Sequence, residues 1–171
     1  MEYKQGIIEA MNYLSTKKNT IFMGEGVVNA GRIYGTLDGV DKKFCIEFPI
    51  AENLIVGSAI GLAIMGYRPI VIFQRMDFML VAADAILNHI ALIPKMSGGR
   101  INLPIIMRAI IGSRKDTFDV GLQHNKDLTY IFKPFIFTAE LKKGMNAKKY
   151  YECAWSSTSP TLIVEDRDLY E

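Results

Sequence analysis

The sequence has few of the residues that mark disulfide frameworks and metal sites. Its 171 residues include two cysteines and two histidines, and Cys45 and Cys153 lie far apart without a metal-type spacing. The longest apolar stretch, from Leu54 to Met65, is too short to cross a bilayer. The first residues lack the basic-then-apolar order of a signal peptide. We therefore expect a reduced, cytoplasmic protein without a membrane span.

The sequence also lacks an excess of charge of one sign. The formal net charge is +2, and the basic residues are spread among the acids. A nucleic-acid-binding protein would instead concentrate lysine and arginine on one face. The sequence therefore predicts no nucleic-acid partner.

What the sequence does contain is apolar material for one core. Half of the residues are apolar and 22% are charged, which predicts a single globular domain over residues 1–171. Helical and strand-like segments alternate, and the strand-like segments are apolar enough to be covered on both faces. The predicted fold is α/β, with three layers and a mostly parallel central sheet flanked by helices. Helices are expected near residues 7–14, 51–66, 78–93, 126–132 and 146–156, and strands near 20–23, 43–48, 69–73, 105–109, 135–139 and 161–165.

Two segments without a clear period are expected to be long loops. Residues 24–41 and 112–124 are rich in glycine, aspartate and asparagine, and each follows a predicted strand. In open parallel sheets, ligands bind beside the carboxyl ends of the strands. A binding site is therefore expected where these loops begin.

Glu52 lies in an apolar context at the same edge. It stands in Phe48–Gly57, between an apolar strand and an apolar helix. Burying an unpaired carboxylate costs several kcal/mol unless it stays protonated or finds a partner. A carboxyl group in such a setting is a common catalytic device, so Glu52 is the first candidate for a functional residue.

Two glycine-containing segments leave alternatives open. Gly24–Gly31 follows a strand and is similar to a dinucleotide-binding turn, but its third glycine comes two positions late and no clean helix follows. The helix after Glu52 carries small residues from Gly57 to Ala63. This surface fits either close packing on the chain's own sheet or a helix–helix contact between subunits.

Three ring side chains have both a structural and a functional interpretation. His124 lies in a predicted loop, where it is either an ordinary surface histidine or an acid, a base or an oxyanion donor. His89 lies inside a predicted helix, where a structural or partly exposed role is favoured. Phe78 is either core packing or a stacking platform for a flat ring.

Many short segments together resemble one family, the pyrimidine-binding domain of the transketolase-like thiamine diphosphate enzymes, and especially the beta subunit of 2-oxoacid dehydrogenases. The resemblance runs nearly end to end, and the order and spacing of the matches make it specific. The matching segments include Phe22-Met23-Gly24-Glu25, Phe48-Pro49-Ile50-Ala51-Glu52, Gly66-Tyr67-Arg68-Pro69, Asp77-Phe78, Pro104-Ile105-Ile106-Met107-Arg108 and Gly121-Leu122-Gln123-His124.

The resemblance implies a role for four residues. Glu52 matches the glutamate that hydrogen-bonds N1′ of the cofactor's aminopyrimidine, where its proton favours the imino tautomer that activates thiazolium C2. Phe78 matches the aromatic residue that stacks on the pyrimidine, and Ile50 lies close to the same pocket. His124 matches a histidine near the reacting substrate oxygen. The implied cofactor is thiamine diphosphate, and the implied substrate is a small keto compound.

The sequence departs from the family in what it omits. The diphosphate and Mg²⁺ motif, a G-D-G followed by a distant asparagine, is missing, and so is the second domain of the beta subunits. The resemblance therefore implies an alpha-like partner chain that carries the diphosphate-binding domain and holds Mg²⁺. Self-association into an α2β2 heterotetramer is the family expectation. Asn53 and Asn125–Asp127 also differ from the usual neighbours of Glu52 and His124, which leaves the substrate open.

Three functions remain open from the sequence. The first is a split thiamine diphosphate enzyme that carries out ketol or acyl transfer or 2-oxoacid decarboxylation. The second is the beta-type part of a multi-chain 2-oxoacid dehydrogenase E1 component, with the missing domain on another polypeptide. The third is a non-catalytic interaction subunit that has kept the fold.

Overall fold

The central sheet has six strands, all parallel. The computed structural model describes residues 2–29, 31–115 and 122–170. The strand order is β2-β1-β3-β4-β6-β5, and every neighbouring pair runs parallel. The expectation of a mostly parallel α/β sheet is confirmed. The strands are β1 (Thr20–Gly24), β2 (Cys45–Glu47), β3 (Arg68–Phe73), β4 (Ile106–Ile111), β5 (Phe137–Glu140) and β6 (Thr161–Asp166).

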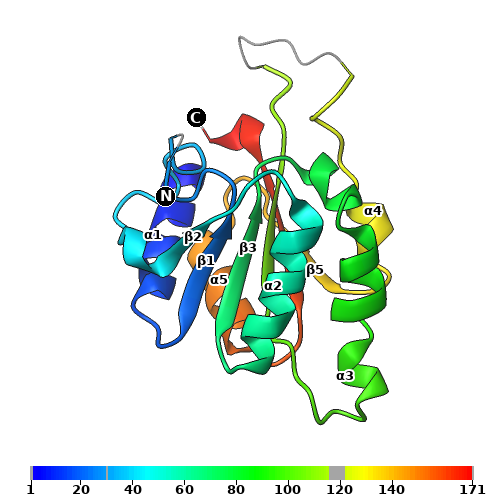
Figure 1. Cartoon of the computed structure of the whole chain (residues 1–171). Coiled ribbons are helices and arrows are strands. Elements are labelled where there is room, and N and C mark those ends of the chain that lie inside the picture. The colour runs from blue at the N-terminus through cyan, green and yellow to red at the C-terminus, as the bar shows by residue number, and fades with distance from the viewer. Residues whose placement is uncertain (1, 30, 116–121, 171) are drawn as a thin grey trace.

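Helices cover both faces of the sheet, which gives three layers (Figure 1). α1 (Tyr3–Ser15) and α5 (Ala147–Ser156) pack against each other and share one hydrophobic cluster. α2 (Glu52–Ile64) and α4 (Thr129–Phe132) lie on the other face with a second cluster. The helical segments η2 (Met76–Leu80), η3 (Ala85–Ile90) and α3 (Ile93–Met96) continue this second layer.

The burial of the strands explains their sequence. β4 is buried at every position, and β3 at every position except its first. Strands covered on both faces are near-continuous runs of apolar, β-branched residues, as these are. β2 at one edge is short and largely exposed, and a short 3-10 turn, η1 (Lys42–Phe44), replaces the first half of the strand predicted at 43–48.

The helix predicted at residues 78–93 is wrong as a single α-helix. A 3-10 helix ends at Leu80, a π-helix spans Ala85–Ile90, and α3 begins only at Ile93. The amide of Ala91 donates to the carbonyl of Ile86, five residues back, which widens the helix. Pro94 lacks an amide hydrogen, so a separate turn starts beside it.

In the segment predicted as a loop at 24–41, Gly24 is the last residue of β1, and the described residues from 25 to 41 contain neither a regular helix nor a strand. It is nevertheless anchored, because Ile33, Leu37 and Val40 are buried in the α1 and α5 cluster. No helix among the described residues is long and apolar enough to span a membrane.

Candidate functional site

The site begins at the carboxyl edge of the sheet, where β1, β3 and β4 end. Glu52 opens α2 at this edge, and its side chain is buried, with a relative exposure of 5%. Its carboxylate receives no hydrogen bond from any residue that the structure describes. It faces a narrow cleft, and the residues that line this cleft are Glu25, Glu52, Ile55, Ile72, Phe73, Gln74 and Phe78.

Two carboxylates, those of Glu25 and Glu52, line the cleft, and a third, that of Glu47, acts on Glu25 through its charge. Burial, together with the negative charges of Glu52 and Glu47, raises the pKa of Glu25 above its usual value. Glu47 is held in place because the backbone amides of Gly26 and Val28 donate to its two carboxylate oxygens, at 2.5 and 2.6 Å. The cleft is therefore acidic. A bound group that shares a proton with these carboxyl groups is favoured there, and a bound anion is disfavoured.

The loop after β1 is fixed to the cleft by Gln74. Its Nε2 donates to the backbone carbonyl of Glu25 at 2.7 Å. Gly26 has a positive φ of 69°, and a Cβ there would lie 2.4 Å from Gln74 Nε2. Glu25 and Gln74 were not among the site residues predicted from sequence. Their positions directly after β1 and β3, at the same edge as Glu52, could have indicated them.

Phe78, which lines the cleft, is in contact with His124. Their ring centroids lie 5.1 Å apart, with an angle of 51° between the planes. Phe78 is only half-buried and lines the cleft, so it is not an ordinary core residue. His124 has a strained backbone, with φ 62°, and its buried Nδ1 has no hydrogen-bond partner within the described residues. This ring nitrogen is thus a buried polar atom without a partner among the described residues, which is uncommon in folded proteins.

The structure does not bring every predicted residue together. Glu52 and Phe78 line the same cleft, and His124 reaches it through the ring of Phe78. Ile50 has an exposed fraction of 84% and is not among the lining residues. His89 is exposed on η3, 3.5 Å from Asp84, in keeping with the structural interpretation.

The chemistry of the cleft fits a flat, protonatable ring better than the alternatives. Apolar walls and Phe78 suit an aromatic ring, and the unpartnered Glu52 carboxyl suits a ring nitrogen. Among the described residues there is no group of three or more acidic, cysteine or histidine side chains that could hold a metal. The Gly24–Gly31 turn leads into turns and then η1, not into the long helix that a dinucleotide site requires.

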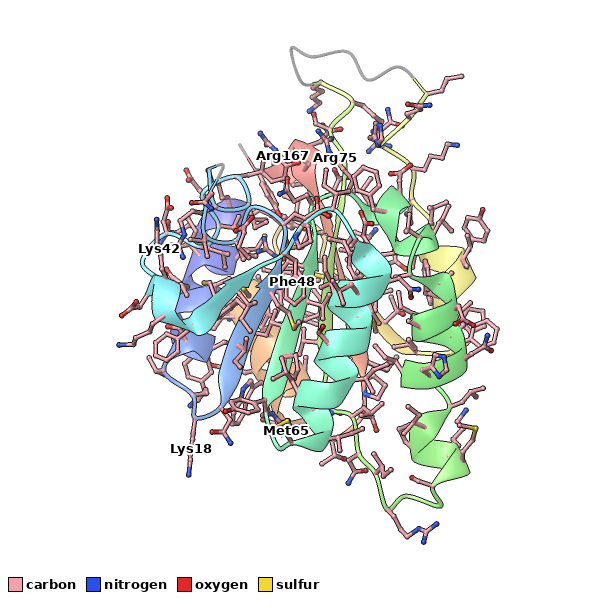
Figure 2. The ribbon with its side chains drawn as sticks, in the orientation of Figure 1. Lys18, Lys42, Phe48, Met65, Arg75 and Arg167 are labelled. Atoms are coloured by element: carbon pink, nitrogen blue, oxygen red, sulfur yellow. The ribbon has the colours of Figure 1, made fainter. Side chains whose placement is uncertain are left out.

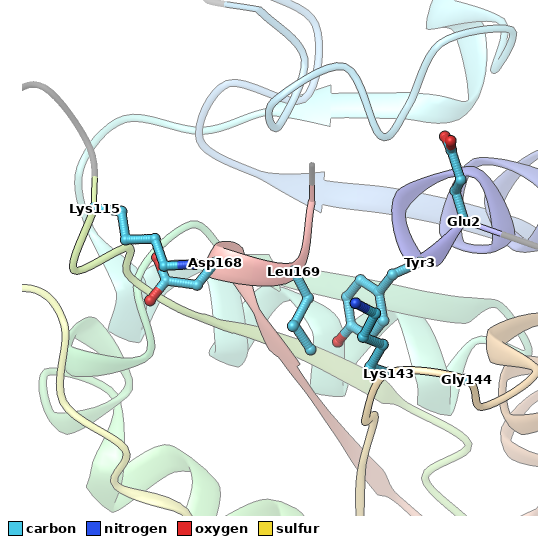
Figure 3. A pocket seen from close by; sticks show the side chains of 7 residues that line it. All are labelled: Glu2, Tyr3, Lys115, Lys143, Gly144, Asp168 and Leu169. Carbon is cyan, nitrogen blue, oxygen red and sulfur yellow. The ribbon is translucent and has the colours of Figure 1, made fainter.

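A larger hollow lies elsewhere, with about 990 Å³ of empty space (Figure 3). It opens between the start of α1 and the final 3-10 turn η4 (Arg167–Leu169), and its lining includes Lys115 and Lys143. It shares no residue with the Glu52 cleft. A choice of site by the size of the hollow alone would thus miss the Glu52 cleft.

The sequence matches a known protein family. The family described as "Transketolase, pyrimidine binding domain" matches residues 1–118, a range that includes Glu52 and Phe78 but not His124. The chain is 32% identical over 158 residues to the pyruvate dehydrogenase E1 component subunit beta of Cyanidium caldarium, covering 89% of this chain and 47% of that protein. A chloroplastic subunit beta-3 from Arabidopsis thaliana is 30% identical over 154 residues, with 86% and 37% covered.

Solved structures show the same fold at low sequence identity. A split gene transketolase, described as an inactive beta4 tetramer, matches with a TM-score of 0.72 at 15% identity, over 96% of this chain and 51% of that chain. A thiamine diphosphate-dependent 4-hydroxybenzoylformate decarboxylase from Rhodococcus jostii RHA1 matches with a TM-score of 0.68 at 16% identity, over 96% and 30%. The chain thus spans about half, or less, of the length of the proteins it matches.

Proposed function

The chain belongs to the family of transketolase pyrimidine-binding domains, and we propose that it is the cofactor-activating subunit of a split thiamine diphosphate enzyme. The reaction class is ketol or acyl transfer or 2-oxoacid decarboxylation on a small keto substrate. The observation that carries this proposal is the buried, unpartnered Glu52 carboxyl, which faces an apolar cleft beside Phe78. A carboxylate in the first turn of a helix is favoured by the helix dipole, but that preference does not require the carboxyl group to be buried beside an apolar cleft.

In this proposal each residue has a distinct task. Bound thiamine diphosphate would supply a nucleophilic carbon for attack on the substrate carbonyl. Glu52 would hold a proton at N1′ of the pyrimidine ring, and the low water content of the cleft would keep that proton in place. Phe78 would orient the ring by stacking. His124, with its free buried Nδ1, would donate to or take a proton from the substrate oxygen.

The proposal requires an alpha-like partner chain. We propose that this partner carries the diphosphate-binding domain and Mg²⁺, since the described residues offer no metal-binding group. The chain itself would then contribute only the pyrimidine half of the cofactor site. The names of a relative and of a structural neighbour, a pyruvate dehydrogenase E1 subunit beta and a split gene transketolase, support an assembly of more than one chain.

The exposed face of α2 supports association with other chains. At Gly57 and Gly61 no atom lies within 4 Å of the position that a Cβ would occupy, so these glycines do not pack on the chain's own sheet. Leu54, Ile64 and Met65 are exposed beside them. Ala59 and Ala63, by contrast, are buried against the sheet. Packing on the chain's own sheet thus holds for the buried face, and we propose that the open face forms the self-association contact of an α2β2 assembly.

A second candidate follows from the names of the relatives. They are beta subunits of the pyruvate dehydrogenase E1 component, which favours a beta-type part of a multi-chain 2-oxoacid dehydrogenase. Transfer of an acyl group to a lipoyl carrier by the isolated complex would separate this candidate from the first. We propose the cytoplasm as the location, although several of the relatives are chloroplastic.

The first experiment is to isolate the tagged chain gently from its host and identify its companions by native mass spectrometry. A complex that contains a second chain with a diphosphate motif, together with thiamine diphosphate, is the expected result. A homomer that binds no thiamine diphosphate, even when Mg²⁺ and cofactor are added, would contradict the proposal.

The α2 contact has a test of its own. Gly61→Leu is expected to leave the isolated chain folded, because no atom lies within 4 Å of a Cβ there. In the isolated complex it is expected to shift the mass distribution toward assemblies with a single copy of this chain. An unchanged copy number would place the contact elsewhere.

A further inference from the structure

A guanidinium lies beside His124, away from the acidic end of the cleft. Arg75 follows Gln74 in extended backbone, with φ −129° and ψ 129°. Successive side chains in extended backbone point to opposite sides, so Arg75 is directed away from Gln74 and Glu25. Its Nη1 lies 3.5 Å from the backbone carbonyl oxygen of His124. Figure 2 shows Arg75 at the carboxyl edge of the sheet.

The end of β4 leaves room for this guanidinium. Gly112, just after β4, is buried, and a Cβ on it would lie 2.5 Å from Arg75 Nη1 and 1.8 Å from the carbonyl oxygen of His124. Any side chain at residue 112 would displace both groups. The backbone there is thus shaped to keep Arg75 and His124 together.

The charge of Arg75 is not balanced within the described residues. Arg108 and Arg114 pair with nearby carboxylates, but Arg75 has no acidic oxygen within 4.0 Å in that part of the chain. A guanidinium has five donor hydrogens, and the long contact with His124 uses one of them. Partial burial of a cation whose donor hydrogens are unused costs free energy, unless an anion accepts hydrogen bonds from it.

The charged residues around the site are unevenly distributed. Glu25, Glu47 and Glu52 make one end negative and would repel an anion. Arg75 places a positive charge beside His124, whose ring contacts Phe78 of the cleft and whose Nδ1 has no partner among the described residues. A keto substrate with a negatively charged group would therefore bind with that group at Arg75.

We propose that Arg75 binds an anionic group of the keto substrate, a carboxylate or a phosphate, and that it selects charged over neutral keto compounds. This inference rests on the proposed function, since it takes His124 to lie at the substrate. Arg75 is then a specificity-determining residue, and it takes no part in holding the cofactor.

The test measures binding rather than turnover, on the native complex loaded with thiamine diphosphate. Three probes are titrated by saturation-transfer NMR: pyruvate, fructose 6-phosphate and the neutral ketone dihydroxyacetone. The variants are Arg75→Gln and Arg75→Lys, with Arg100→Gln as a matched control. Arg100 is exposed beyond α3, where its Nε donates to the carbonyl of Ser97 at 2.9 Å. Cofactor affinity is measured in parallel for every variant.

The expected result is that one anionic probe binds more tightly than dihydroxyacetone. Arg75→Gln should weaken that probe roughly tenfold to a hundredfold, as loss of a charged hydrogen bond does. Arg75→Lys should restore part of the affinity, and Arg100→Gln should change nothing. Preference for pyruvate would assign a carboxylate to the site, and preference for fructose 6-phosphate a phosphate.

Two outcomes would overturn the inference while leaving the proposed function intact. The first is equal binding of the anionic probe by Arg75→Gln and the unmodified complex, with the cofactor bound in both. The second is a cofactor-loaded complex that does not prefer either anion over dihydroxyacetone. A complex that binds no thiamine diphosphate would instead remove the proposed function, and this inference with it.

Discussion

Two glutamates in this chain, Glu165 and Glu52, are almost equally buried but differ in their hydrogen-bond partners. Glu165, on β6, has no exposed surface and is fully partnered: Arg108 on the neighbouring β4 donates to both of its oxygens, at 2.9 and 2.8 Å. The hydroxyls of Tyr151 and Tyr170 also donate to it. Burial and the Glu165 charge raise the pKa of both tyrosines well above the usual range, which keeps them as donors.

Glu52 has none of these partners. It is buried at the start of α2, faces an apolar cleft, and receives no hydrogen bond from the described residues. The fold can therefore satisfy an internal carboxylate, and it does so at Glu165. Leaving Glu52 unsatisfied is consistent with a carboxyl group reserved for a ligand, because strained or unpaired groups persist where function requires them.

The largest effect on stability is expected at the partnered glutamate. Glu165→Leu leaves the Arg108 guanidinium buried and unpaired, which should lower the free energy of unfolding by about 3–5 kcal/mol. Urea unfolding of the purified chain measures this loss. The double variant Arg108→Met/Glu165→Leu should recover much of it. A single variant as stable as the unmodified chain would show that the pair does not hold the sheet together.

A smaller loss is expected at Gly112. A methyl group there would lie 1.8 Å from the carbonyl oxygen of His124, so Gly112→Ala should cost roughly 1–3 kcal/mol through forced backbone shifts. Gly57→Ala is the matched control on α2, where no atom lies within 4 Å of the added methyl. The control should gain about 0.5–1 kcal/mol from helix propensity in the isolated chain. Equal melting behaviour of the two variants would contradict the tight convergence at His124.

The acidic end of the cleft predicts a pH-dependent effect. The pKa of Glu25 is raised in the folded chain, so the folded state binds a proton more tightly than the unfolded state, and stability falls as pH rises through Glu25's titration, from its ordinary value near 4.5 upward. Glu25→Gln should therefore be more stable than the unmodified chain at neutral pH. This difference should vanish below pH 4.5, where both forms are uncharged. Urea midpoints at the two pH values give the comparison; a gain that persists at low pH would exclude charge repulsion as its cause.

The smallest effect is expected at a partly exposed carboxylate. Glu140 on β5 forms ion pairs with Lys133 and Lys142, whose side chains are largely exposed to solvent. Its pKa is lowered by hydrogen bonds from Lys142 and Lys133. Glu140→Gln should change the free energy of unfolding by less than about 1 kcal/mol, because solvent screens exposed pairs. The effect should shrink further in high salt, and a loss as large as that of Glu165→Leu would show that exposure does not separate the two sites.

The sequence was most informative where burial determines the residue type. The apolar, β-branched runs in β3 and β4 could hardly form anything but strands of a covered sheet. Glu52 was identified because an acid stands alone among apolar residues. The pairing of Arg108 with Glu165 was not foreseen, since the two residues are 57 positions apart and their register depends on the sheet.

Other features could not be predicted from local pattern. The apolar spacing between Phe78 and Ile93 does not distinguish hydrogen bonds to the fourth residue back from bonds to the fifth, so the π-helix was missed. Ile50 precedes Glu52 by two residues, yet its side chain faces solvent. Arg75 stands out only in three dimensions, because its neighbours Gly112 and His124 come from distant loops.

The most direct test of the account is the rate at which the C2 proton of thiamine diphosphate exchanges with deuterium in the native complex. The rate is measured by rapid quench and NMR for the unmodified complex and for Glu52→Gln, with cofactor binding checked in both. If Glu52 supplies the proton at the pyrimidine ring, the variant should still bind the cofactor and should exchange at least about a hundredfold more slowly. Exchange at the unmodified rate, with the cofactor bound, would contradict the central role of Glu52.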